Sequence, residues 1–303
     1  MQSESIFNYS LSENHKVMLW MRRFVWKIII ATVALMIVGS ATRVMNAGLA
    51  CPDWPLCYGQ LLPSKYLLNL QVFLEWFHRL DAALIGLSTL VLAALAWFYR
   101  KDLPLWFPIL STVALGLIIW QGALGGLTVT QLLRFDIVTA HLGTALLFLS
   151  TLVVIAVASG QYQMRKNSKA LFWSGLVAAL VIYTQSILGG LVASRWALHQ
   201  CLADTKLCQV INNHLFGVLP SSLVILLLFI LSFRQDCSAI VRKLAIAAMA
   251  LLVTQICLGV ATMRLHLQVE PLTVAHHTVA ALLLSVLVAF SILAHRNAYE
   301  VKL

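Results

Sequence analysis

The chain has 303 residues, of which 61% are hydrophobic and only 11% are charged, and its mean hydropathy is +0.89. These values exclude a soluble globular domain and indicate a polytopic membrane protein. The net charge of +10 is then explained by membrane topology and by contact with anionic lipids of the bilayer, so we expect no nucleic-acid partner.

Eight apolar stretches approach or exceed the roughly 20 residues that a membrane-spanning helix needs. In chain order, the predicted spans are 23–44, 73–98, 105–124, 137–159, 170–192, 213–233, 244–263 and 274–294. The first span is longer than the apolar region of a signal peptide, so we expect no cleavable signal.

The distribution of Lys and Arg predicts the orientation of the chain in the membrane. With the N-terminus inside, 14 of the 21 basic residues fall on the inner side and seven on the outer side. Because cytoplasmic segments carry the excess of basic residues, both termini are predicted to be cytoplasmic.

A five-residue pattern that begins with glutamine and ends with glycine recurs in the odd-numbered spans. It occupies Gln121–Gly125 in the third span, Gln185–Gly189 in the fifth and Gln255–Gly259 in the seventh, while the first span keeps only Gly39. This recurrence indicates that the chain contains an internal duplication.

The spacing of other landmarks supports the duplication. Cys51 and Cys201 are 150 residues apart, whereas His78 and His214 are 136 apart, so the first outer loop is about 14 residues longer than its counterpart. We therefore predict an all-α membrane protein with eight transmembrane helices, arranged as two tandem four-helix bundles related by a pseudo-twofold axis. The predicted halves are residues 1–160 and 161–303.

Four histidines stand at equivalent places, in the first turns of an even-numbered span just after an outer loop. They are His78, His141, His214 and His276. Neutral imidazole is a good metal ligand and is otherwise costly in hydrocarbon. Two ligands per bundle favour haem over catalytic zinc, which usually has three protein ligands. Interfacial or hydrogen-bonded histidines are the alternative, and the neighbouring His277 could replace His276.

Two further sets of residues could serve a haem, although each also has a purely structural explanation. Small residues that would let a flat macrocycle approach, or simply let helices pack, are Gly125, Gly143, Gly189, Gly190 and Gly259. Outer cations that would bind propionates, or anchor the chain at the interface, are Arg43, Arg79 and Arg195.

Four of the six cysteines lie in outer loops, as the pairs Cys51/Cys57 and Cys201/Cys208. Of the three connectivities that four cysteines allow, the duplication favours one disulfide within each loop. The oxidising outer side would let such bonds persist. The first pair could be a structural staple or a redox-active group.

Glu75 lies three residues before His78 and therefore on the same helix face. It could be a helix N-terminal acid favoured by the helix dipole, or an acid–base group beside a haem. The second half has Ile211 at this spacing. The difference suggests that one bundle performs chemistry and the other holds a cofactor.

Taken together, these features resemble the haem A synthase family, and in particular its cysteine-containing bacterial branch. The resemblance rests on the eight duplicated spans, on Glu75 and His78, on the later histidines, on the Gln121–Thr128 stretch and on the paired outer cysteines. It implies oxidation of the C8 methyl of haem O to a formyl group, by successive hydroxylations, to supply haem A for terminal oxidases.

The resemblance also implies roles for individual residues. His78 and His141 would frame the substrate haem O, and His214 and His276 would bind a haem b cofactor. Glu75 would assist at the methyl group. The Cys51–Cys57 disulfide would be redox-active or structural.

The setting implied is the bacterial cytoplasmic membrane, with the haem sites near its outer face. Haem O synthase and an electron donor are candidate partners, while a homo-oligomer, the identity of the donor and the source of oxygen stay open. Rival functions are a two-haem electron-transfer cytochrome, a non-enzymatic haem carrier, and a thiol oxidoreductase built on Cys51 and Cys57. The last is disfavoured because Cys-x-x-Cys spacing is absent.

Overall fold

The computed structural model of the chain describes residues 2–162, 169–194, 205–265 and 269–299. Within these residues the regular structure is helical, with one isolated bridge between Cys57 and Gln60. Eight helical spans among them are long and apolar enough to cross a membrane. The predictions of an all-α fold and of eight spans are therefore confirmed.

The helices follow the predicted spans, with differences at their ends. They are α1 (Gln2–Val44), α2 (Leu70–Phe98), α3 (Trp106–Thr130), α4 (Phe135–Ala158), α5 (Lys169–Ser194), α7 (Thr205–Phe216), α8 (Val218–Arg234), α9 (Ala239–Arg264) and α10 (Glu270–Tyr299). The first helix begins well before residue 23 because hydropathy marks only its apolar part. No glycine or proline interrupts residues 2–22.

The sixth span consists of two helices, α7 and α8, which meet at Gly217. His214 therefore lies in the last turn of α7 and, as predicted, in the first turns of the continuous apolar span Gln209–Arg234. A Cβ built on Gly217 would collide with the side-chain oxygen of Gln185 from α5. Glycine at this position lets the Gln185 side chain reach the backbone of α7 beside the histidine.

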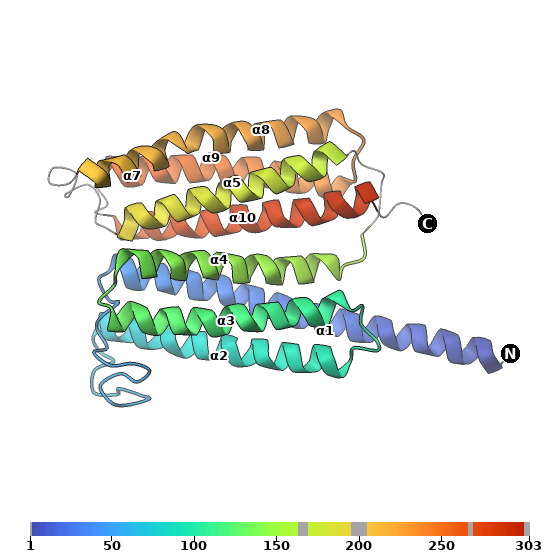
Figure 1. Cartoon of the computed structure of the whole chain (residues 1–303), viewed down its shortest axis with the longest axis horizontal. Helices are drawn as coiled ribbons and strands as arrows, with labels where there is room; N and C mark the ends of the chain where they lie inside the picture. The colour runs from blue at the N-terminus through green and yellow to red at the C-terminus, as the bar shows by residue number, and fades with distance from the viewer. Residues whose placement is uncertain (1, 163–168, 195–204, 266–268, 300–303) are drawn as a thin grey trace.

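The helices contact one another as two four-helix groups (Figure 1). In the first group α1, α2, α3 and α4 contact in succession and α4 contacts α1. In the second group α5, α8, α9 and α10 form a similar ring, with α7 against α5 and α8. The groups meet where α1 and α4 contact α10 and where α4 contacts α5. The pseudo-twofold relation and the boundary at residue 160 stay predictions.

The core lies where the two groups meet. Half of the most apolar stretch of α4 and 44% of that of α10 are buried, against 17–28% in the other spans. Phe148 of α4 and Phe290 of α10 are almost completely buried in it. The two groups are therefore packed together through these two helices, and residues from one group lie beside the site of the other.

Candidate functional site

In the first group, each predicted histidine lies against a glycine of a neighbouring helix. A Cβ built on Gly39 of α1 would lie 2.7 Å from Cε1 of His78 on α2. A Cβ built on Gly125 of α3 would lie 3.3 Å from Cε1 of His141 on α4. The two histidines also interact electrostatically with each other. The fold therefore brings them to one site.

The second group repeats this arrangement. A Cβ built on Gly189 of α5 would lie 3.0 Å from Cε1 of His214 on α7, and one on Gly259 of α9 would lie 3.0 Å from Cε1 of His276 on α10. These two histidines likewise interact electrostatically. The glycines are those that end the repeated sequence pattern, so the duplication extends to the packing of the rings.

Each ring also contacts the backbone four positions before its glycine. The residues are Leu35, Gln121, Gln185 and Gln255. The glutamine side chains add contacts in the second group, where Gln185 Nε2 donates to the His214 carbonyl oxygen at 2.6 Å. Gln255 Nε2 lies 3.2 Å from His276 Nε2. The repeated glutamine thus serves the histidine site directly.

All four rings keep one buried nitrogen without a hydrogen-bond partner. The Nδ1 atoms of His78, His141, His214 and His276 share this property. Buried polar atoms without a partner are uncommon in folded proteins, and they point to a missing ligand or water. Nowhere in the described ranges do three His, Cys, Asp or Glu side chains gather as a metal site.

The donor set fits haem. Two imidazoles per group, each with a buried nitrogen that has no protein partner, would suit a haem iron. A zinc site would require further ligands.

His277 differs from His276 in its contacts. Its Nδ1 atom lies 2.8 Å from Oγ of Ser40 on α1, so the ring bridges the two helix groups. His276 instead faces Gly259 and Gln255.

The remaining glycines of the predicted set serve helix packing. A Cβ on Gly143 would lie 2.8 Å from Ile187, and one on Gly190 would lie 2.8 Å from Leu142. Both contacts hold α4 against α5. The structure thus separates glycines that face histidines from glycines that join helices.

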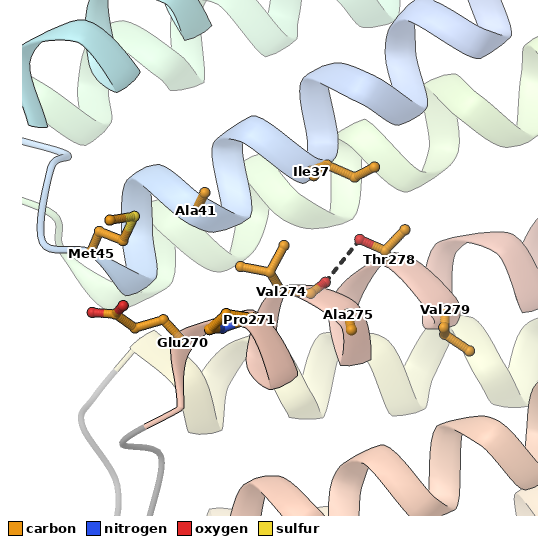
Figure 2. Close-up of a pocket in the computed structure, with 9 residues that line it drawn as sticks. All are labelled: Ile37, Ala41, Met45, Glu270, Pro271, Val274, Ala275, Thr278 and Val279. Carbon is orange, nitrogen blue, oxygen red and sulfur yellow. Dashed lines mark hydrogen bonds between the residues drawn. The ribbon is translucent and has the colours of Figure 1, made fainter. Parts of the chain in front are cut away.

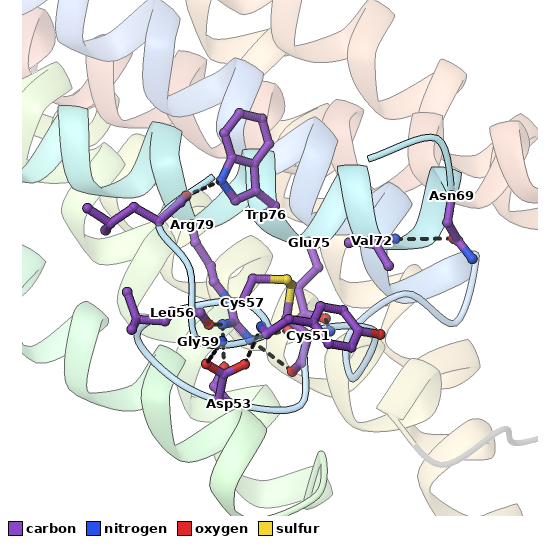
Figure 3. Close-up of a disulfide and its surroundings, with 12 residues drawn as sticks. Cys51, Asp53, Leu56, Cys57, Gly59, Asn69, Val72, Glu75, Trp76 and Arg79 are labelled. Carbon is purple, nitrogen blue, oxygen red and sulfur yellow. Dashed lines mark hydrogen bonds and ion pairs between the residues drawn. A yellow bond between two sulfur atoms is a disulfide. The ribbon is translucent and has the colours of Figure 1, made fainter. Parts of the chain in front are cut away.

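The first outer loop contains the predicted Cys51–Cys57 disulfide, with a sulfur–sulfur distance of 1.99 Å (Figure 3). Both cysteines are buried, at 0% and 1% exposure. The predicted Cys201–Cys208 pair falls outside the residues whose side chains are described, as does Arg195. Cys237 and Cys257 form no disulfide.

Arg79 organises the disulfide loop. Its guanidinium pairs with Oε1 of Glu75 at 2.5 Å. It also donates to the carbonyl oxygens of Asp53, at 2.6 Å, of Cys51 and of Leu56 (Figure 3). Both terminal nitrogens of Arg79 are therefore engaged by the loop and by Glu75, so the structure gives no support to its binding a haem propionate.

Glu75 takes part in the same network. It is only 3% exposed, and its Oε2 atom accepts a hydrogen bond from the Cys51 backbone amide at 2.8 Å. The carboxylate therefore joins α2, one turn before His78, to the disulfide. It is the carboxylate predicted to stand beside a haem, and here both of its oxygens are engaged.

The loop also covers the His141 side of the site. Trp54 lies against Gly126 of α3, where a Cβ would be 3.1 Å from Cε2 of its ring. The Asp53 carboxylate accepts hydrogen bonds from Gly59 and Tyr58, and these hold the pKa of Asp53 below its usual value. The charged form of Asp53 thus fixes the turn that follows the disulfide.

A separate groove of about 530 Å³ lies between α1 and α10 (Figure 2). Ile37 and Ala41 line one side, and Val274 lines the other. The hydroxyl of Thr278 is bonded to the Val274 carbonyl oxygen, and Glu270 supplies the one carboxylate. The groove suits an apolar chain, and Met45 is the lining residue that carries a sulfur atom.

Sequence reasoning named Gly39 and Arg79 without the contacts that they make, and it missed Trp54. Gly39 was visible as the remnant of the repeated pattern, and Arg79 stands four residues after Glu75, the spacing of a helical ion pair. Trp54 carried no signal, because its contact with Gly126 depends on how the loop folds back.

Comparison with known proteins identifies the family. A family model described as COX15-CtaA, cytochrome oxidase assembly protein, matches residues 22–66 and 68–288. The chain belongs to this family. The matched region contains the disulfide loop and all four glycine-facing histidines, and the predicted family is confirmed. Membership of the cysteine-containing branch stays a prediction.

Several bacterial relatives carry the name Heme A synthase. The protein from Shewanella oneidensis is 27% identical over 318 residues, covering 87% of this chain and 93% of that protein. The protein from Shouchella clausii is 26% identical over 284 residues, with the same two coverages. The protein from Halalkalibacterium halodurans is 24% identical over 217 residues, covering 66% of this chain and 71% of that protein.

The glycine–histidine contact predicts that a side chain at Gly125 displaces His141. We expect Gly125→Val to lower the haem content of the purified protein by about one haem per chain. Gly122→Val is the matched control on the same helix, because nothing lies within 4 Å of a Cβ there. Equal haem contents in the two variants would contradict the assignment of this contact.

The Arg79 network predicts that Arg79→Leu exposes the disulfide to reductant. The change leaves Glu75 buried without its partner, which costs about 3–5 kcal/mol locally. We expect reduction of Cys51–Cys57, followed by thiol labelling, to become at least about tenfold faster. Arg134→Leu, which removes an exposed ion pair with Asp136, should leave the rate unchanged. An unchanged rate in Arg79→Leu would refute the role given to Arg79.

Proposed function

We propose that this chain is a haem A synthase, which oxidises the C8 methyl group of haem O to a formyl group by successive hydroxylations. The observation that carries the proposal is the set of four buried histidines, each facing a glycine and each with a nitrogen free of partners. Family membership and relatives named Heme A synthase support the same activity.

We assign the substrate haem O to His78 and His141, and a haem b cofactor to His214 and His276. The assignment is supported by the asymmetry of the halves, since the first has the carboxylate of Glu75 three residues before a histidine, where the second has Ile211. A bound haem b would supply a redox-active iron. The protein's part is to hold both haems and to exclude water from the substrate side with the disulfide loop.

Glu75 is the proposed acid–base group of the substrate site. Its Oε1 atom pairs with Arg79 and its Oε2 atom accepts from Cys51. Protonation of the carboxylate would remove the charge that pairs with Arg79, so proton transfer and the position of the loop are linked. The alternative role is to anchor the loop without exchanging protons.

For Cys51 and Cys57, burial of both sulfur atoms supports a structural role. A disulfide that exchanges with a partner thiol needs an accessible sulfur.

For the second histidine of the cofactor site, the contacts support His276 over His277, because Nδ1 of His277 is engaged by Ser40.

The excess of basic residues on one side supports cytoplasmic termini and outer haem sites. The starts of α2 and α4, where the disulfide loop lies, are at the end of the molecule opposite to the N-terminus (Figure 1). We propose the bacterial cytoplasmic membrane as the location, with haem O synthase and an electron donor as candidate partners.

The direct test is to purify the protein from a membrane host that makes haem O but no haem A, and to identify the extracted haems by chromatography and mass. We expect haem b together with hydroxylated or formylated haem O. Haem b alone, at two per chain, would instead indicate an electron-transfer cytochrome. Absence of haem would reject the proposal.

Variants of Glu75 separate its two roles. Glutamine can still accept the Cys51 amide hydrogen bond but cannot exchange protons. If Glu75 is the acid–base group, Glu75→Gln should keep the haem content and the protected disulfide yet lose about 99% of product formation, because general acid–base catalysis contributes at least about 100-fold. Normal product with an intact loop would leave Glu75 only the anchoring role.

The cofactor assignment predicts that His214→Ala or His276→Ala removes the tightly bound haem b, measured as haem content and low-spin absorption. His295→Ala is the control, since His295 lies on α10 in an exposed position. Retention of the normal spectrum in both site variants would overturn the assignment.

A further inference from the structure

The structure distinguishes among the three outer arginines that the sequence offered as propionate ligands. Arg79 is engaged by Glu75 and by loop carbonyls, and Arg195 lies outside the described residues. Arg43, in the last turn of α1, is different, because its Nη2 atom is buried and has no hydrogen-bond partner. An arginine that only reached for the lipid headgroups would expose this group to water.

Arg43 belongs to the first helix group but lies beside the histidine site of the second. One turn before it, Ser40 is hydrogen-bonded to Nδ1 of His277 at 2.8 Å. The Arg43 guanidinium lies within electrostatic range of the His277 ring, and so do His276 and His214. Electrostatic partners of His78, by contrast, include Arg79 and not Arg43.

No carboxylate in the described part of the chain pairs with Arg43. The outer acids Glu75 and Asp136 are paired with other arginines, and Asp53 accepts from loop amides. Glu270 is exposed at the start of α10 and makes no ion pair with Arg43. A buried guanidinium nitrogen without an acceptor is unfavourable, and a planar carboxylate is the ligand that a guanidinium binds best.

We propose that Arg43 binds a propionate carboxylate of the haem held by His214 and His276, so that the first helix group completes the cofactor site of the second. This inference rests on the proposed function, which puts a haem at that histidine pair. The charge-assisted hydrogen bonds from the guanidinium would hold the haem in place. Its positive charge would also favour the reduced iron.

The test uses the full-length protein with His141→Ala as background, to empty the substrate site. In it, Arg43→Gln is compared with Arg264→Gln, which removes an exposed arginine from the outer end of α9. The readouts are the rate of haem transfer to apomyoglobin and the midpoint potential. We expect Arg43→Gln to lose haem about thirtyfold faster and to lower the potential, with neither change in Arg264→Gln.

Arg43→Lys provides a second variant that keeps the charge and avoids a loss of folding. Its midpoint potential should stay close to that of the parent. It should still lose haem faster than the parent, because an ammonium cannot bind both oxygens of a carboxylate as a guanidinium does. Unchanged haem transfer and potential in both Arg43 variants would overturn the inference. In that case His214→Ala shows which claim is wrong. If His214→Ala loses its haem, the haem site stands and only the Arg43 inference fails. If it keeps its haem, the proposed function fails as well.

Discussion

The packing of each histidine ring against a glycine is the contact on which this structure depends. An imidazole inside a membrane needs partners for its nitrogens, and a ring held between helices needs space that any side chain larger than glycine would fill. Gly39, Gly125, Gly189 and Gly259 provide that space at four equivalent places. The odd-numbered spans thus shape the pockets, and the even-numbered spans carry the rings.

The two sites differ in what surrounds the rings. The first is closed by a long loop, in which Arg79 joins Glu75 to the backbone around the disulfide. In the second, Gln185 reaches α7 through the break at Gly217, and Ser40 and Arg43 approach from the other half. Loss of the contact between Ser40 of α1 and His277 of α10 should therefore affect the second site, although α1 belongs to the first group.

The sequence was sufficient to predict features that follow from periodicity and composition. Length and hydropathy predicted the eight spans, and the repeated pattern predicted which glycines and histidines are equivalent. The Cys51–Cys57 pairing followed from the duplication and is present in the structure.

Features that depend on tertiary contact were not predictable in this way. Arg43 and Arg79 are both outer arginines near a helix end. Only the folded chain shows that both terminal nitrogens of Arg79 have partners while Arg43 has a buried nitrogen without one. The need for glycine at position 217 is explained by a side chain from another helix, Gln185. A sequence pattern cannot report such an approach, because it is set by how α5 packs on α7.

The central claim is that two pairs of glycine-facing histidines hold two haems. A cryo-electron microscopy map of the protein, purified with its haems from a host that makes haem O, tests this most directly. The account predicts one flat macrocycle between His78 and His141 and a second between His214 and His276. Histidine pairs without a macrocycle, or a macrocycle held by other residues, would contradict it.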